Sequence, residues 1–562
     1  MKRVLFTICA AITLSALSAQ VIYRPSPPEW ECIAEGGQFM DRFLPMPDGK
    51  LSMDNWGAGC VQPRYIDNGL EDAENSYWGG NIIKDEKGKY HMYVSGWSED
   101  AEKGHMGWLN NSNVYHATAD SSFGPFTMQE RIGIGHNSEV VKLKDGSYMI
   151  YHIDGRGYRD SDCHYYLSKS PYGPWEKREM AWDLRGRARV DGIGATGPKT
   201  WSHNMSFARR EDGSVLMVSR GGKIFISEDG ISKYNRVSNG SVYPYIDGRY
   251  EDPVIWRDNV QYNLIVNDWI GRTAFYLRSK DGLNWVVDPG MAYMPGISKH
   301  KDGRVENWYK YERMRVYQDE YGRATQANFA VIDTIKHNDL PGDNHSSKNI
   351  VIPLNKGMLL EVLNKIPITR LTKEIAVKIA REEGFNPAEE IDLESLHFGA
   401  SSEVNFGRGA KALRGELSGD DFIVYFEAKN HCITDEEFAP KMLGKNKSGE
   451  MIYGYSRLPW IDYAPAILSA NPPVLRNTKA SVVVDNFGTS TSAGALVSVN
   501  VYDESGKEVE LFSAKLSPIK PYGSQEVSAE LGKNAEKLKS GSSIVVRVHT
   551  GTQKPTVFHM VM

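Results

Sequence analysis

Five short segments of this chain share one plan, and their recurrence constrains the fold more than any other feature of the sequence. Each opens with polar or acidic residues, continues into a β-rich stretch and closes with a turn and an aromatic side chain. The openings are Trp78-Gly79-Gly80-Asn81, His136-Asn137-Ser138-Glu139, Ser202-His203-Asn204-Met205, Glu251-Asp252-Pro253 and Glu312-Arg313-Met314-Arg315. Aligned on Asn81, Asn137, Asn204, Asp252 and Glu312, they lie 56, 67, 48 and 60 residues apart. Strand repeats of this length are typical of β-propellers, whose blades are four-stranded sheets around a central channel.

Hairpin signals accompany these repeats. Asp145-Gly146 and Asp212-Gly213 each separate the first β-rich run of a segment from the second. Asp-Gly between two such runs is the strongest short-range hairpin signal. We therefore predict an all-β protein with a five-bladed β-propeller over residues 76–355, in which the first strand of each blade faces the axis.

The rest of the chain has a different pattern. Leu371, Ile375 and Ile379 fall four residues apart and Gly384 follows, which indicates a linking helix over residues 371–383. Later β-rich runs lack the blade motif and favour β-sandwiches. The predicted divisions are a signal peptide (1–19), an irregular arm (20–75), the propeller (76–355), a linker with a helix (356–394) and β-sandwich modules (395–470 and 474–562).

Charge and targeting signals limit the functional classes. The formal net charge of −5 argues against a nucleic-acid partner, because phosphate binding normally leaves a basic footprint. Lys2-Arg3 precedes an apolar run that ends near small residues, as in a secretory signal peptide. That run is too short for a membrane span. We expect an exported protein, periplasmic or secreted, without a membrane span.

Acidic residues at the blade openings suggest the chemistry. The candidates are Glu139, Glu251, Asp252 and Glu312. Glycoside hydrolysis needs one carboxyl group kept protonated and a second one ionised. Several acids in one funnel separate their pKa values, because like charges disfavour joint ionisation. The alternative for each of these residues is a carboxylate that only accepts hydrogen bonds from backbone N–H groups at a strand start.

These openings, the segment Glu251-Asp252-Pro253-Val254-Ile255-Trp256 and the turn Ser170-Pro171-Tyr172-Gly173-Pro174-Trp175 resemble five-bladed propeller glycosidases of glycoside hydrolase families 43 and 32. The resemblance covers residues 76–355. It implies an Asp base or nucleophile, an Asp that tunes pKa two blades later and a Glu acid on the next blade. On that pattern Asp252 is the tuning residue, Glu312 the acid and Glu139 the base.

The chain also departs from this pattern. Asn81 stands where the family has its first-blade Asp, and an amide cannot accept the proton. A second register makes Glu251 the acid, but His203 and Asn204 then stand where an Asp is expected. Three interpretations stay open: a register rotated by one blade, a divergent family with altered chemistry, and a sugar-binding propeller without catalysis.

Other polar and aromatic residues at the openings are predicted to bind substrate. Tryptophans before the openings can stack on a sugar ring, with packing between blades as the alternative. Histidines on neighbouring blades can hold a hydroxyl group, a water or a cation. Arginines can recognise a carboxylate or sulfate. The candidates are Asn81, His136, Asn137, His203, Trp78, Trp201, Trp308, Arg313 and Arg315.

The sequence thus favours an exported glycoside hydrolase that acts on a plant or algal polysaccharide or oligosaccharide. One alternative is a non-catalytic carbohydrate-binding propeller, and another is a polysaccharide lyase. The expected partner is a carbohydrate. The chemistry requires no metal or cofactor, although carboxylate and amide ligands on the axis would suit Ca²⁺.

Overall fold

A computed structural model describes residues 24–57, 59–154, 163–183, 203–238, 240–341, 347–369, 371–503, 505–538, 541–551 and 555–561. Strands dominate, and the α-helices in this part are single turns: α1 (Trp108–Asn111), α3 (Pro387–Glu390) and α4 (Ser401–Val404). The all-β prediction is confirmed. The predicted signal peptide lies outside the described residues. Within them, no helix is both long and apolar enough to cross a membrane.

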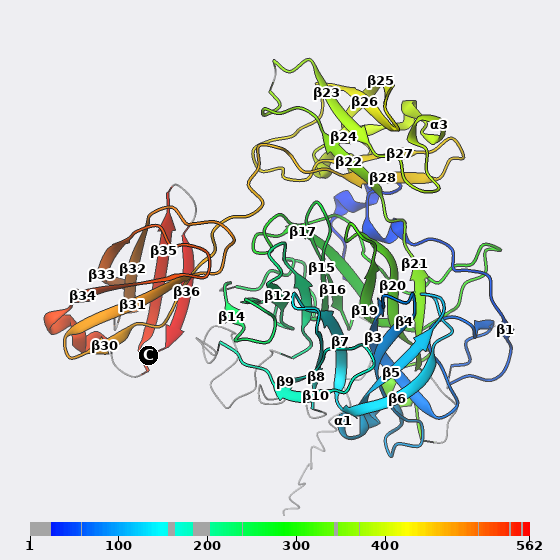
Figure 1. Cartoon of the computed structure of the whole chain (residues 1–562), viewed down its shortest axis with the longest axis horizontal. Coiled ribbons are helices and arrows are strands. Elements are labelled where there is room, and N and C mark those ends of the chain that lie inside the picture. Colours follow the sequence, from blue (N-terminus) through cyan, green and yellow to red (C-terminus); the bar gives the residue numbers. More distant parts are fainter. Residues whose placement is uncertain are drawn as a thin grey trace, which may run out of the picture.

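Residues 75–353 form five consecutive antiparallel sheets, which make up the largest body in Figure 1. Strands that follow one another along the chain are neighbours in each sheet, so the strand order is the chain order. The sheets are β3 (Asn75–Lys84), β4 (Tyr90–Ser98), β5 (Asn113–Ala119) and β6 (Thr127–Ile134); β7 (His136–Lys142), β8 (Tyr148–Ile153), β9 (Cys163–Ser168) and β10 (Glu176–Glu179); β11 (Ser206–Arg209), β12 (Val215–Val218), β13 (Ile224–Ser227) and β14 (Asn235–Arg236); β15 (Tyr250–Arg257), β16 (Tyr262–Asp268), β17 (Thr273–Ser279) and β18 (Val286–Val287); and β19 (Lys310–Gln318), β20 (Ala324–Ile332) and β21 (Ser347–Pro353).

The first strands of the five sheets close a ring. Strand β3 lies against β7, β7 against β11, β11 against β15, β15 against β19, and β19 against β3. The N-terminal arm, which contains β1 (Leu51–Ser52) and β2 (Arg64–Tyr65), pairs with the three-stranded last sheet through a bridge between Leu70 and Asn349. Next to it, the Asn68 amide donates to the Val351 carbonyl (2.9 Å) and accepts from its N–H (2.9 Å). The arm therefore supplies the outer neighbour that the last sheet lacks.

A left-handed residue recurs where each first strand begins, and it corrects the alignment of the repeats. Strands β3, β7, β15 and β19 each have a register shift there, and the equivalent point in the third sheet directly precedes β11. The left-handed residues are Gly79 (φ 76°), Asn137 (φ 59°), Asn204 (φ 57°), Asp252 (φ 53°) and Arg313 (φ 54°). Asn81 and Glu312 are therefore not the equivalents of Asn137.

Residues 358–455 form a closed barrel, which corrects two predictions. Its order is β22 (Met358–Val362), β23 (Glu374–Ile379), β26 (Asp421–Glu427), β25 (Ala410–Ser418), β24 (His397–Gly399), β27 (Lys441–Lys445) and β28 (Met451–Tyr455). A β-sandwich over 395–470 is therefore wrong. The helix over 371–383 is also wrong, because Ile375, Val377 and Ile379 are buried at every second position of strand β23, and β-branched side chains favour strands.

The C-terminal residues form two four-stranded sheets around one apolar core. The strands of the first are β29 (Leu468–Ala470), β30 (Val474–Arg476), β31 (Lys479–Asn486) and β34 (Ser524–Glu530); those of the second are β32 (Ala495–Tyr502), β33 (Glu508–Leu516), β35 (Ser543–Thr550) and β36 (Thr556–Val561). Ser469 Oγ donates to the Arg236 carbonyl of the third sheet in the ring (2.8 Å).

Candidate active site

Three carboxylates from two neighbouring sheets meet at the axis of the ring. Glu251 and Asp252 lie at the start of β15, and Glu312 lies at the start of β19. One carboxyl oxygen from each lies within 4.8 Å of the others. Asp252 and Glu312 are buried, whereas the Glu251 side chain keeps 16% of its surface exposed. The structure therefore brings together three of the four acids predicted from the sequence.

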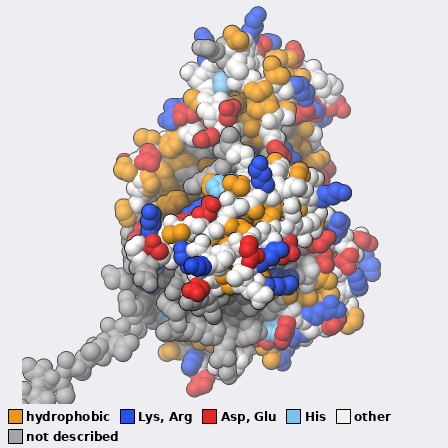
Figure 2. Space-filling view, turned by 90° about the vertical axis from the view of Figure 1, so that its left-hand side faces the viewer, with side chains coloured by type: hydrophobic (Ala, Val, Ile, Leu, Met, Phe, Trp, Pro, Cys, Tyr) orange, Lys and Arg blue, Asp and Glu red, His pale blue; other side chains and the backbone are white. Residues whose placement is uncertain are grey.

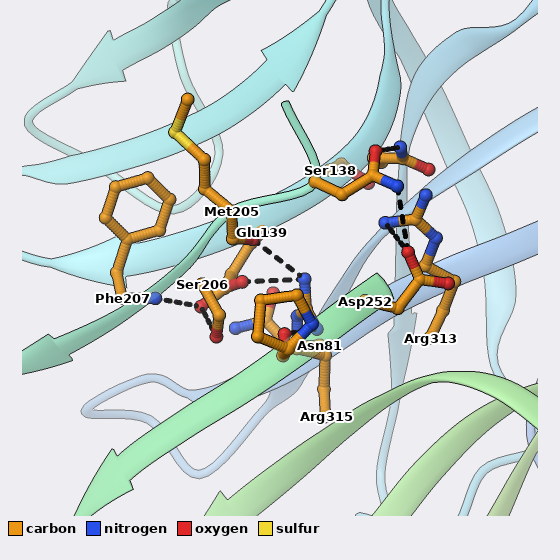
Figure 3. Close-up of polar contacts among 12 residues, drawn as sticks. Asn81, Ser138, Glu139, Met205, Ser206, Phe207, Asp252, Arg313 and Arg315 are labelled. Atoms are coloured by element: carbon orange, nitrogen blue, oxygen red, sulfur yellow. Dashed lines mark hydrogen bonds and ion pairs between the residues drawn. The ribbon is translucent and has the colours of Figure 1, made fainter. Parts of the chain in front are cut away.

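Four of the left-handed residues, including the acid Asp252, are connected by polar contacts. Asn137 Nδ2 donates to Asn204 Oδ1 (2.6 Å), and Asn204 Nδ2 donates to Asp252 Oδ1 (2.9 Å). The same oxygen pairs with Arg313 Nη1 (3.0 Å), and Figure 3 shows Asp252 and Arg313 facing each other. A Cβ on Gly79 would lie 3.5 Å from Arg313 Cβ, an ordinary van der Waals contact, so the left-handed φ of 76° favours glycine here and the available space does not. Asn204 and Arg313 thus hold the Asp252 carboxylate in place.

Cationic side chains pair with the other two acids. Glu312 Oε2 binds Lys336 Nζ (2.5 Å), and its other oxygen pairs with Lys310. Glu251 Oε2 binds Arg220 Nη2 (2.6 Å), and Arg220 Nη1 donates to His203 Nε2 (3.0 Å). Ion pairs therefore hold both carboxylates, and the contact between Lys336 and Glu312 is also a charge-assisted hydrogen bond.

The environments separate the pKa values of the two glutamates. Burial and the neighbouring carboxylates of Asp252 and Glu312 raise the pKa of Glu251 to about 7, against the opposing effect of Arg220. Burial also acts to raise the pKa of Glu312, but Lys310 and Lys336 outweigh it and hold that pKa well below its usual range. Near neutral pH, Glu251 can carry a proton while Glu312 is ionised.

Glu139 lies outside this group of three acids. Its carboxylate bridges two sheets, accepting from Phe207 N–H (3.0 Å) and Ser206 Oγ (3.2 Å). Arg315 Nη2 binds its second oxygen at 2.7 Å, and Figure 3 shows this ion pair apart from Asp252. Burial raises the pKa of Glu139, and Arg315 opposes that shift. Both members of the pair are buried. Glu139, the predicted base, and Arg315, predicted to bind substrate, therefore pair with each other.

Asn81 has the same bridging role one sheet earlier. Its amide donates to the Val140 carbonyl (2.8 Å) and accepts from the Val140 N–H (2.7 Å). It is thus the equivalent of Glu139 and Ser206, whose side chains contact the backbone of the next first strand. Gly79, not Asn81, holds the position in this sheet that Asp252 holds in the fourth. The acid that the resemblance implies on the first blade is therefore replaced by glycine at position 79, and Asn81 is not its substitute.

The remaining predicted residues differ in their access to the site. Trp78 lies under Lys336, whose Nζ is 4.5 Å from the indole ring centre. His136 is buried against Trp108, and burial holds its pKa well below the usual value. Trp308 is fully buried and donates its indole N–H to Glu306 (2.9 Å), so it packs within the fold and cannot stack on a sugar. Trp201 lies outside the described residues.

Sequence reasoning missed three cations of the site. Lys310 is two residues before Glu312, and alternate residues of a strand share a face, so that spacing was a usable signal. Arg220 follows β12 and Lys336 follows β20, in loops that do not repeat from sheet to sheet. Nothing in the repeat pattern indicates that these two loops reach the axis.

The three clustered carboxylates could in principle hold Ca²⁺, but their surroundings do not favour it. Arg220, Arg313, Lys310 and Lys336 already form ion pairs with them. A divalent ion would have to displace these cations and would then lie among their positive charges. We expect the melting temperature to be the same in excess EDTA and in excess CaCl₂, measured by differential scanning fluorimetry. A calcium-dependent increase, abolished by Asp252→Asn, would contradict this expectation.

Comparisons with known proteins identify only remote similarity. No family model matches the chain, and no curated protein matches it significantly. Solved structures that resemble it include an endo-arabinase from Bacteroides thetaiotaomicron, with 13% identity over 50% of this chain and 94% of that chain and a TM-score of 0.32. Others are an α-L-arabinofuranosidase from Lactobacillus brevis (11%, 50% and 92%, TM-score 0.34) and a mutant GH43 protein from Bacillus licheniformis (9%, 87% and 90%, TM-score 0.34). Similarities this low establish neither a family nor an activity.

Proposed function

We propose that the five sheets are the blades of one propeller and that the protein is a glycoside hydrolase with its active site at Glu251, Asp252 and Glu312. The observation that carries this proposal is the proximity of two glutamates whose environments separate their pKa values, next to an aspartate that is fixed by hydrogen bonds. Pairs of carboxyl groups tuned in this way serve as acid and base, or as acid and nucleophile, in glycoside hydrolysis.

In this mechanism Glu251 donates a proton to the leaving oxygen. Its side chain is the most exposed of the three acids, and burial with the neighbouring carboxylates raises its pKa to about 7, so a large fraction still carries the proton near neutral pH. Glu312 stays ionised beside Lys310 and Lys336 and faces the positive charge that develops on the sugar ring. Asp252 raises the pKa of Glu251 without moving, because Asn204 and Arg313 hold it.

The separation of the carboxyl groups bears on stereochemistry. One carboxyl oxygen of Glu251 and one of Glu312 lie within 4.8 Å of each other. Carboxyl groups about 5–5.5 Å apart are typical of retaining enzymes, and about 6.5–9.5 Å of inverting enzymes. The spacing favours retention, with Glu312 as the group that attacks the anomeric carbon. Polarimetry or NMR of the first product formed would distinguish the two outcomes.

The experiment that tests the activity uses the purified full chain and a panel of plant and algal polysaccharides. We expect new reducing ends from at least one member. Binding to a glycan without release of sugar would instead support the non-catalytic propeller. A product that absorbs in the near ultraviolet would identify a lyase. An N-terminal segment absent from protein recovered outside the cytoplasm would support the proposed export.

A further inference from the structure

The loop that carries Lys336 is anchored at both ends by aspartates. Lys336 begins η5 (Lys336–Asn338), a single 3₁₀ turn that follows strand β20. Asp333 precedes this turn and Asp339 follows it, and both side chains are buried. Each accepts hydrogen bonds from backbone N–H groups of another segment of the chain. The place of Lys336 is therefore set by contacts outside its own sheet.

Asp333 binds the N-terminal arm. Its Oδ2 accepts from the N–H groups of Gly59 (2.7 Å) and Cys60 (3.2 Å), and two successive N–H groups that converge on one oxygen are an established way to hold a carboxylate. A Cβ on Gly59 would lie 2.6 Å from the Asp333 carbonyl oxygen. A larger residue at position 59 would therefore push the arm and the loop apart.

Asp339 binds the first sheet of the ring. Its Oδ2 accepts from the His105 N–H (2.6 Å), in the connection between β4 and β5. His105 packs edge-on against the Trp78 ring, and the same ring lies 4.5 Å from Lys336 Nζ. Between the two anchors, Lys336 Nζ reaches Glu312 Oε2 at 2.5 Å.

We propose that Asp333 is a positioning residue of the axial site, which keeps Lys336 in contact with Glu312 by binding the arm. This inference rests on the proposed function and deepens it. Lys336 and Lys310 together hold the pKa of Glu312 well below its usual range. If the anchor were lost and Lys336 moved away, Lys310 alone would oppose the effect of burial, and that pKa would rise.

The anchor does not depend on the protonation state of Asp333. Burial raises the pKa of Asp333 to about 7, against the N–H groups of Gly59 and Cys60, and Asp339 adds to the rise. Oδ2 accepts both hydrogen bonds, whereas the buried Oδ1 has no hydrogen-bond partner among the described residues. A proton on Oδ1 therefore leaves both hydrogen bonds in place. Asp333→Asn keeps an acceptor oxygen in the same way, and Asp333→Ala removes it.

Lysine labelling tests the position of Lys336 without any assay of turnover. Acetylation of the folded full chain, followed by peptide mass spectrometry, gives a rate for each lysine. We expect Asp333→Ala and Gly59→Ala each to raise the Lys336 rate at least fivefold, because the amine leaves its ion pair, and Asp333→Asn to raise it less. Lys and Arg side chains are scattered over the face shown in Figure 2, so lysines elsewhere serve as internal references.

The acidic limb of kcat/KM against pH is the readout that a purely structural role would not move. With Lys336 displaced, Glu312 gains its proton at a higher pH, so this limb should move up by at least one pH unit in Asp333→Ala and Gly59→Ala, as in Lys336→Met. Asp333→Asn should move it less.

Two matched controls should keep the wild-type labelling rate and the wild-type limb. Asp120→Ala changes an aspartate whose side chain is 95% exposed. Gly240→Ala adds a Cβ that would meet no atom within 4 Å. Circular dichroism would verify that every variant is folded.

The outcomes separate this inference from the proposed function. A wild-type rate of Lys336 labelling in folded Asp333→Ala and Gly59→Ala, or an unmoved acidic limb in these variants, would overturn the positioning role. Equal effects of Asp333→Asn and Asp333→Ala would overturn the role of the acceptor oxygen. Faster Lys336 labelling in a protein that releases sugar from no glycan would support the anchoring of Lys336 and contradict the hydrolase.

Discussion

Replacing Glu251 with glutamine should lower kcat/KM by about 10²–10⁴-fold on the natural glycan, which is the range that a general acid contributes. The amide has nearly the same shape but cannot donate the proton that the leaving oxygen needs. Because Arg220 can still donate to the amide oxygen, we expect the fold to persist. Steady-state kinetics with reducing-end detection would measure the effect.

A change of leaving group sharpens this prediction. Some aryl glycosides have a phenol that leaves without protonation. On such a substrate, Glu251→Gln should lose far less activity than it does on the natural glycan. Glu228→Gln changes an exposed glutamate directly after β13; it is the matched control and should keep wild-type rates on both substrates. Equal losses on both substrates would assign Glu251 a role other than proton donation.

Replacing Glu139 with methionine should lower the free energy of unfolding by about 3–5 kcal/mol, because it leaves Arg315 buried without a counterion. The double variant Glu139→Met/Arg315→Met should regain part of this loss, since no buried charge remains. Urea unfolding followed by tryptophan fluorescence would measure both changes. Glu179→Met, on exposed β10, is the control and should change stability by no more than about 0.5 kcal/mol.

The same variants decide between the two roles of Glu139. If Glu139 is structural, folded Glu139→Met protein should keep activity of the wild-type order at low temperature. Unchanged stability together with lost activity would show that Glu139 is catalytic, as the sequence alone suggested, and would contradict the structural role.

The repeat predicts the acids at the axis but not their register. Residues that recur every 48 to 67 positions indicate blade openings, and Glu251, Asp252 and Glu312 follow from them. The register depends on a left-handed residue. Glycine, asparagine and aspartate adopt this conformation more readily than other residues, whereas Arg313 gives no such signal. Aligning Asn81 with Asn137 follows residue type, whereas backbone conformation aligns Gly79 with Asn137.

The parts that the sequence could not predict depend on contacts between distant segments. The barrel closes because β22 pairs in parallel with β28, with Met358 opposite Gly454, and alternating strands would look the same in a sandwich. Ile375 and Ile379 fit a helical spacing, but Val377 between them fits a strand, and tertiary pairing with β26 decides the outcome. Arg220 and Lys336 reach the axis from loops whose sequences carry no repeat.

The pH dependence of kcat/KM in wild type and Arg220→Met tests the central claim most directly. Glu251 acts in its protonated form, so activity should be high at acidic pH and should fall as pH rises through a pKa near 7. Arg220 lowers the pKa of Glu251, and its removal should therefore move the alkaline limb to higher pH. An alkaline limb that stays at the same pH in Arg220→Met would contradict Glu251 as the proton donor.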